Sequence, residues 1–66
     1  MKLKVNGEER EVEVGTTVTA LLDSLGLNRD GVAVAVAGHV VPRTQHPERE
    51  LQDGEAVEVI RAVGGG

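Results

Sequence analysis

The sequence predicts an α+β fold in which one short helix packs on one face of a small mixed sheet. Three patterns predict it: two alternating segments around Asn6-Gly7, one helical stripe of apolar residues after Gly15, and further strand-like segments in the second half. Sixty-six residues suffice for one small domain. We assign residues 1–63 to that domain and residues 64–66 to a flexible glycine tail.

The chain opens with two segments, residues 1–5 and 11–14, in which apolar and charged side chains alternate. A period of two is typical of half-buried strands, and Asn-Gly is a strong hairpin signal. We expect a hairpin whose core-facing side chains are Leu3, Val5, Val12 and Val14.

The register of this hairpin has two alternatives. A two-residue loop at Asn6-Gly7 places Leu3 opposite Arg10. A four-residue loop over residues 6–9 instead places Leu3 opposite Val12 and sets lysines against glutamates. Because apolar and oppositely charged cross-strand pairs stabilise a sheet, we expect the four-residue loop.

A short helix is predicted over residues 17–25. Gly15 ends the preceding strand, and Thr16 or Thr17 caps the helix. Gly26 stands at the C-cap position, and Leu27 is expected beneath the helix. The apolar stripe has the i, i+3, i+4, i+7 spacing of an amphipathic helix: Val18, Leu21, Leu22 and Leu25.

Two strands are predicted next. Residues 32–37 alternate valine and alanine, so we expect the valines to face the helix and the alanines to form a thinly covered outer face. Gly38-His39 allows a bend before a short strand at Val40-Val41. Residues 42–52 are polar and contain two prolines, which predicts an irregular stretch with Leu51 as its one core anchor.

The last predicted strand covers residues 56–63, after a turn at Asp53-Gly54. Parallel neighbours need a long crossover connection, and the helix supplies one between the first strand and the last. We therefore expect these two strands to lie side by side.

Composition excludes several functions. The absence of cysteine removes disulfides, thiolate metal sites and a thiol nucleophile. A net charge of −4 without any aromatic residue argues against nucleic-acid binding and favours a protein partner with a basic face. His39 and His46 lack metal-ligand spacing, and no phosphate-binding glycine loop is present, so we expect no metal and no bound cofactor. Without a signal peptide or a membrane-spanning run, a cytoplasmic monomer is expected.

The glycine tail carries the chemistry that we consider most informative. Glycine can approach a partner's backbone closely, and three extended residues reach roughly 10 Å, enough to enter a narrow active-site channel. A terminal carboxylate on Gly66 is ionised at neutral pH. It can attack the α-phosphate of ATP when an enzyme positions both groups. The alternative is a frayed terminus without a function.

Three segments carry a resemblance to a known family: the opening strand that ends in Asn6-Gly7, residues 34–43 (VAVAGHVVPR), and residues 51–60 (LQDGEAVEVI) running on to Gly65-Gly66. With them the chain resembles the ubiquitin-like β-grasp sulfur carriers of the ThiS/MoaD family. The resemblance covers essentially the whole chain. It departs at Ala37, where asparagine is usual, and at His46, where tryptophan is frequent.

The resemblance implies a carrier without catalytic side chains of its own. An E1-like adenylating enzyme of the ThiF type would adenylate Gly66 with MgATP. Sulfur from a cysteine desulfurase pathway would replace the adenylate, and the Gly66 thiocarboxylate would deliver it to a thiazole synthase of the ThiG type. Gly64 and Gly65 would allow the tail to thread into these enzymes.

A docking surface is expected beside the tail. Val57 and Val59 should face the core, so that Ile60 and Ala62 point to the opposite, alanine-rich face. An apolar sheet face marks a contact surface, and we expect Ile60, Arg61 and Ala62 to contact the adenylating enzyme. The alternative is that residues 42–51 cover Ile60.

Other functions stay open at this point. Carriers for molybdopterin synthesis share the tail chemistry but are typically longer, and carriers for tRNA thiolation are similarly short. A ubiquitin-like modifier would instead be joined through Gly66 to lysines of target proteins. A plain interaction module would not need Gly65 and Gly66.

Overall fold

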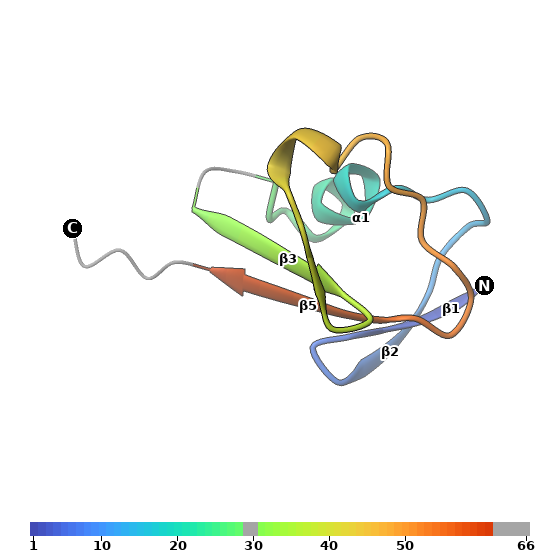
Figure 1. Ribbon diagram of the computed structural model, residues 1–66. Helices are drawn as coiled ribbons and strands as arrows, with labels where there is room; N and C mark the ends of the chain where they lie inside the picture. Colours follow the sequence, from blue (N-terminus) through green and yellow to red (C-terminus); the bar gives the residue numbers. More distant parts are fainter. Residues whose placement is uncertain (29–30, 62–66) are drawn as a thin grey trace.

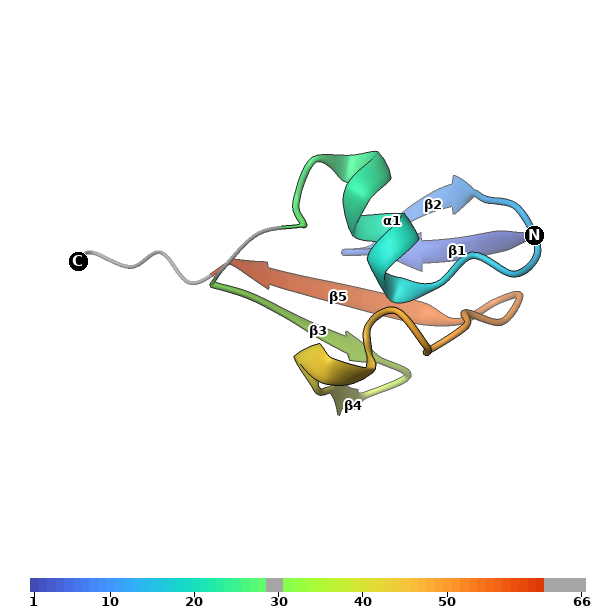
Figure 2. The same ribbon diagram turned by 90° about the horizontal axis from the view of Figure 1, so that it is seen from above.

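The computed structural model describes residues 1–28 and 31–61. In these residues five strands form one sheet in the order β2-β1-β5-β3-β4, and a single α-helix crosses one of its faces (Figures 1 and 2). The predicted α+β fold with one helix on a mixed sheet is therefore confirmed. Its elements are β1 (Lys2–Val5), β2 (Glu8–Glu11), α1 (Val18–Leu25), β3 (Val32–Val36), β4 (His39–Val41), the 3-10 turn η1 (Arg43–Gln45) and β5 (Ala56–Arg61).

The first hairpin differs from the prediction. Its loop is the two-residue Asn6-Gly7 turn, and Leu3 stands opposite Arg10 rather than Val12. Both turn residues have positive φ, 51° at Asn6 and 83° at Gly7. This combination is typical of the type I′ turn, whose twist matches that of the two flanking strands. Local turn geometry therefore decides the register.

The second strand is also earlier than predicted. It covers Glu8–Glu11, all four of its side chains are exposed, and Val14 lies beyond it with 85% of its surface exposed. β2 is an edge strand, and β1 alone supplies the buried side chains of this hairpin. Opposite charges still face each other, because Lys2 pairs with Glu11 and Lys4 with Glu9. Charge complementarity was thus compatible with both registers and could not choose between them.

The helix agrees with the sequence pattern. Thr17 is the N-cap, and its hydroxyl oxygen accepts a hydrogen bond from the backbone N–H of Ala20 at 3.1 Å. Gly26 ends the helix in the left-handed conformation at φ 72°. The predicted stripe faces the sheet, with three of its members buried and Leu25 partly buried.

The remaining segments are strands as predicted, and the valines of β3 and β5 face the core as predicted. Val34 and Val36 of β3 are buried, and Val57 and Val59 of β5 are buried beside them. β5 runs parallel to β1 and antiparallel to β3, so the first and last strands are neighbours as expected. The central position of β5 places the strand that leads to the glycine tail in the middle of the sheet.

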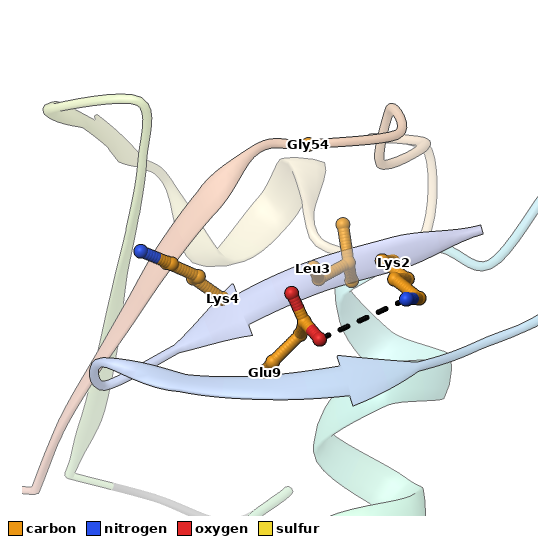
Figure 3. Close-up of a pocket in the computed structure, with 5 residues that line it drawn as sticks. All are labelled: Lys2, Leu3, Lys4, Glu9 and Gly54. Carbon is orange, nitrogen blue, oxygen red and sulfur yellow. Dashed lines mark ion pairs between the residues drawn. The ribbon is translucent and has the colours of Figure 1, made fainter.

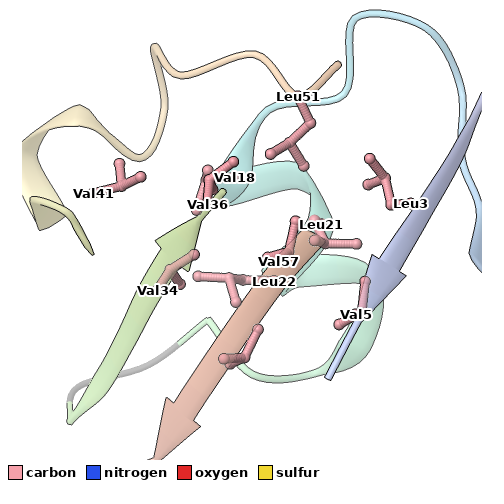
Figure 4. Packing of buried hydrophobic residues seen from close by; sticks show 11 residues of the cluster. Leu3, Val5, Val18, Leu21, Leu22, Val34, Val36, Val41, Leu51 and Val57 are labelled. Carbon is pink, nitrogen blue, oxygen red and sulfur yellow. The ribbon is translucent and has the colours of Figure 1, made fainter. Parts of the chain in front are cut away.

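The core lies between the helix and the sheet (Figure 4). It contains only aliphatic side chains, and valine predominates because most of its members come from strands. Met1, Val12, Leu25, Leu27 and Val32 pack around its edge. The buried members are Leu3, Val5, Val18, Leu21, Leu22, Val34, Val36, Val41, Leu51, Val57 and Val59.

The irregular stretch before β5 supplies hydrogen-bond acceptors to the first backbone N–H groups of the helix. The first N–H groups of a helix lack partners within it. Here the N–H of Val18 donates to the carbonyl of Arg49 at 3.0 Å, and the N–H of Thr19 donates to the carbonyl of His46 at 3.1 Å. This stretch therefore packs against α1, beside the helix in Figure 2.

His46 is a buried polar residue that the sequence analysis missed. It is 6% exposed, and its Nε2 lies 3.0 Å from the carbonyl oxygen of Val41. Leu51 is the member of the hydrophobic core that this stretch contributes, as predicted. A buried ring that can bond a backbone carbonyl satisfies both its apolar and its polar surface, which explains why a histidine fits here.

Hydrogen bonds of Glu55 connect the irregular stretch to the turn before β5. Its carboxylate accepts hydrogen bonds from the backbone N–H of Gln52 at 2.7 Å and from the guanidinium of Arg49 at 2.9 Å. Burial alone would raise the pKa of Glu55, but these two donors and the positive charge of Arg49 lower it below its ordinary value. The carboxylate is thereby kept ionised and paired.

Ala37 occupies a strained position that asparagine would suit better. It lies with Gly38 in the two-residue turn between β3 and β4, at φ 51°. Alanine in this left-handed region carries a steric penalty that asparagine largely avoids. We expect Ala37→Asn to raise the free energy of unfolding by about 0.5–1 kcal/mol, measured by urea unfolding followed by circular dichroism.

The matched control is Ala33→Asn, at an exposed position of β3. Asparagine is disfavoured in strands, so this variant should be slightly less stable than the wild type. A loss of stability in both variants would show that the left-handed turn does not favour asparagine at position 37.

Candidate functional site

The predicted site residues divide at the end of β5. Ile60 and Arg61 are the last two residues of this strand, and both are exposed. Ala62, Gly64, Gly65 and Gly66 lie outside the described residues. The structure thus describes the strand that leads to the tail and the surface around it.

Both sides of β5 are held by hydrogen-bonded neighbours. On one side β3 pairs with it over five positions, from Val36↔Val57 to Val32↔Arg61. On the other side the N–H of Asn6 donates to the carbonyl of Val57 at 2.9 Å. A strand paired on both sides resists fraying. β5 is therefore firmly held as far as Val57, beyond which β3 continues to pair with it as far as Arg61.

Ile60 lies on the sheet face opposite the helix. It is 55% exposed and pairs with Ala33 of β3. The alternative in which residues 42–51 cover Ile60 is wrong, because that stretch packs against α1 on the other face. An exposed isoleucine beside small alanines is apolar surface without a partner in the described chain.

Val40 extends this face and was not predicted. It is 75% exposed and pairs with Ala35, which in turn pairs with Glu58 of β5. The alternation of side chains along a strand could have predicted this exposure. With Val41 buried, its neighbour in the strand must point to the opposite face. We call the surface formed by Ala33, Ala35, Val40 and Ile60 the outer apolar face.

Charged residues lie on the outer face of the sheet at β1, between β2 and β5. Lys2 and Lys4 alternate with buried Leu3 and Val5, and the Nζ of Lys2 lies 3.8 Å from a carboxylate oxygen of Glu9. A hollow of about 230 Å³ lies between these side chains and Gly54 (Figure 3). Exposed ion pairs of this kind contribute little to stability, so we regard this part of the outer face as solvated.

Groups of three or more His, Asp or Glu side chains that could hold a metal ion do not occur in the part of the chain that the structure describes. His39 is exposed, and the ring of His46 contacts a backbone carbonyl. None of the helices in residues 1–28 and 31–61 is long and apolar enough to cross a membrane.

A family comparison decides the relationship. The model of the ThiS family matches residues 3–66, which includes the described sheet from Leu3 onward and all three tail glycines. The chain belongs to the ThiS family. The resemblance inferred from the sequence motifs is therefore confirmed.

Two ThiS proteins match over nearly their full length. The sulfur carrier protein ThiS of Escherichia coli is 30% identical over 66 residues, all of both chains. The ThiS of Thermus thermophilus is 37% identical over 62 residues, 94% of this chain and 95% of the relative. Both relatives are sulfur carrier proteins.

A solved ThiS structure has the same fold. The crystal structure of the thiamine biosynthesis protein ThiS from Geobacter metallireducens superimposes with a TM-score of 0.85 at 35% identity and covers all of both chains. The expected ubiquitin-like β-grasp architecture is thereby confirmed.

Two further relatives are larger proteins. Thiazole synthases of Paramagnetospirillum magneticum and Magnetococcus marinus are each 39% identical over all 66 residues. The chain spans only about a fifth of their length, 20% in both cases. A ThiS-like segment thus occurs within these thiazole synthases.

Proposed function

We propose that this chain is a sulfur carrier of thiamine biosynthesis whose reactive group is the carboxylate of Gly66. The observation that carries the proposal is the match to ThiS sulfur carriers over nearly their full length. In this proposal residues 1–63 form the folded carrier, and residues 64–66 form the flexible tail that enters partner enzymes. The carrier itself is not an enzyme and acts in the cytoplasm as a monomer.

The proposed chemistry has two balanced steps. The Gly66 carboxylate attacks the α-phosphate of ATP, which forms an acyl adenylate and releases pyrophosphate. Sulfide then attacks the acyl carbon, AMP leaves, and the Gly66 thiocarboxylate remains. Where a persulfide is the nucleophile, an acyl disulfide forms first, and a thiol reductant cleaves its S–S bond and is itself oxidised to a disulfide. Positioning of the carboxylate and ATP by the partner supplies the catalysis.

Three partners follow from this chemistry. An E1-like adenylating enzyme of the ThiF type uses MgATP, and a cysteine desulfurase pathway supplies the sulfur. A thiazole synthase of the ThiG type accepts it. The two thiazole synthases that contain a ThiS-like segment support this last pairing, because fusion joins proteins that act together.

The experiment that tests the function is intact-mass spectrometry. The protein is incubated with MgATP, the adenylating enzyme and a sulfide source, and a matched sample lacks ATP. We expect a mass gain that matches replacement of one oxygen by sulfur, only when ATP is present. Trypsin cleavage after Arg61 should release residues 62–66 carrying the whole gain. Lysine adducts of other proteins without any thiocarboxylate would instead support the modifier function.

The outer apolar face is the proposed docking surface for the adenylating enzyme, with Ile60 at its β5 side and with Arg61 and Ala62 following Ile60 in the sequence towards the tail. Ile60→Asp is expected to raise the dissociation constant of that complex at least about tenfold, because a charge would be buried without a partner. Isothermal titration calorimetry measures the affinity, and circular dichroism checks the fold.

Val14→Asp is the matched control for Ile60→Asp. It also places aspartate at an exposed aliphatic residue, but in the loop between β2 and α1. Its affinity should equal that of the wild type. Equal binding by the Ile60 variant would refute docking through this face.

A further inference from the structure

The side chain of Asn6 makes two hydrogen bonds that its turn does not require. Its Oδ1 accepts from the backbone N–H of Val59 at 2.8 Å, and its Nδ2 donates to the carbonyl of Val59 at 3.3 Å. One carboxamide thus satisfies both backbone groups of a single residue in β5. The two residues are 53 positions apart in the sequence.

These bonds continue the ladder between β1 and β5. Along that ladder the N–H of Lys4 donates to Glu55 at 3.0 Å, and the N–H of Asn6 donates to Val57 at 2.9 Å. The next pair of hydrogen bonds, or rung, of this parallel ladder would be made by the backbone two residues further along β1. The chain instead turns back at Asn6, where φ is 51°. The carboxamide, which has the same donor and acceptor as a peptide group, takes the place of the missing rung.

Without this rung the end of β5 would be paired on one side only. β3 pairs with β5 as far as Arg61, whereas the β1 register ends at Val5↔Val57. The backbone groups of Val59 point towards β1, because those of Val57 do and alternate residues share a side. Strand ends with few bonds open locally at low free-energy cost.

We propose that Asn6 is a positioning residue for the sulfur-transfer reactions, a role that rests on the proposed function. Its carboxamide holds β5 in its paired state up to the residues from which the tail departs. A carrier whose β5 end opens would be competent for docking only part of the time. The apparent affinity for the partner enzyme would be reduced in proportion to the fraction of carriers that are competent for docking. The reaction of the bound carrier would be unchanged.

Asn6→Gly isolates the carboxamide from the turn. Glycine adopts positive φ without strain, so the type I′ turn is retained while both bonds to Val59 are lost. Ala37→Gly is the matched control, because Ala37 has the same φ of 51° in the turn between β3 and β4. Thr17→Ala is a second control, because it lowers global stability by removing the N-cap of α1, whose hydrogen bond goes to Ala20 of the helix and not to this ladder.

Two measurements test the role. Amide hydrogen exchange of Val59 should be roughly tenfold faster or more in Asn6→Gly. In both controls it should change only as much as the change in global stability accounts for. ATP–pyrophosphate exchange by the adenylating enzyme should show a KM for the carrier about three- to tenfold higher, with kcat unchanged. Neither control should change KM.

The outcomes separate this inference from the proposed function. Unchanged exchange at Val59 would overturn the missing-rung interpretation. Faster exchange with a wild-type KM would overturn the positioning role and leave the carrier function in place. A wild-type protein that supports no pyrophosphate exchange would overturn the carrier function, whatever Val59 shows.

Discussion

Removal of Gly65 and Gly66 is expected to abolish sulfur loading completely while leaving the fold intact. The proposed reaction takes place on the Gly66 carboxylate, and a shortened chain would present a carboxylate that stops short of the reacting phosphate. Proximity effects in enzymes are lost with displacements of about 1 Å, and two extended residues span roughly 7 Å. Intact-mass spectrometry after incubation with the adenylating enzyme, MgATP and sulfide measures the loss.

Two controls make this result specific. Gly66→Ala keeps the length of the tail and adds one methyl group, so it should be loaded more slowly than the wild type but detectably. Urea unfolding of the shortened chain should match the wild type, because the described core ends at Val59. Sulfur loading of the shortened chain would refute Gly66 as the reactive residue.

Leu22→Ala is expected to cost about 2–5 kcal/mol of unfolding free energy. Leu22 is 1% exposed at the centre of the helix–sheet interface (Figure 4). A domain of this size has a total stability of roughly 3–10 kcal/mol. This single truncation should therefore remove roughly half of the stability, which urea titration followed by circular dichroism would detect as a much lower unfolding midpoint.

Leu25→Ala is the control for this truncation. It makes the same substitution in the same helix at a partly buried position. The change in helix propensity is the same, so the difference between the two variants isolates the cost of the core cavity. Equal losses would show that burial under α1 is not the main source of stability.

Local patterns predicted most of the fold. The helix bounds followed from Thr17, the apolar stripe and Gly26, because caps and periodicity act within a few residues. The side chains of β3 and β5 that face the core followed from the valines at every second position. The crossover argument also placed β5 beside β1, because it depends on connection length alone.

The first hairpin shows where local patterns fail. Two registers satisfied the charge pairing, and the prediction chose the one that buried Val12 and Val14. The structure has the other, because the Asn6-Gly7 turn sets the register and the edge strand β2 contributes no buried side chain. Whether a strand lies at the edge of a sheet depends on strands far along the chain.

The sequence by itself determined the fold class, the family, the buried face of each central strand and the tail as the candidate reactive group. Tertiary structure alone decided that His46 is buried, that Val40 joins Ile60 on the outer apolar face, and that Asn6 supplies the missing rung at Val59. The physical reason is the range of the interactions. Periodicity and capping act over a few residues, whereas a contact across 53 positions exists only once the strands have assembled.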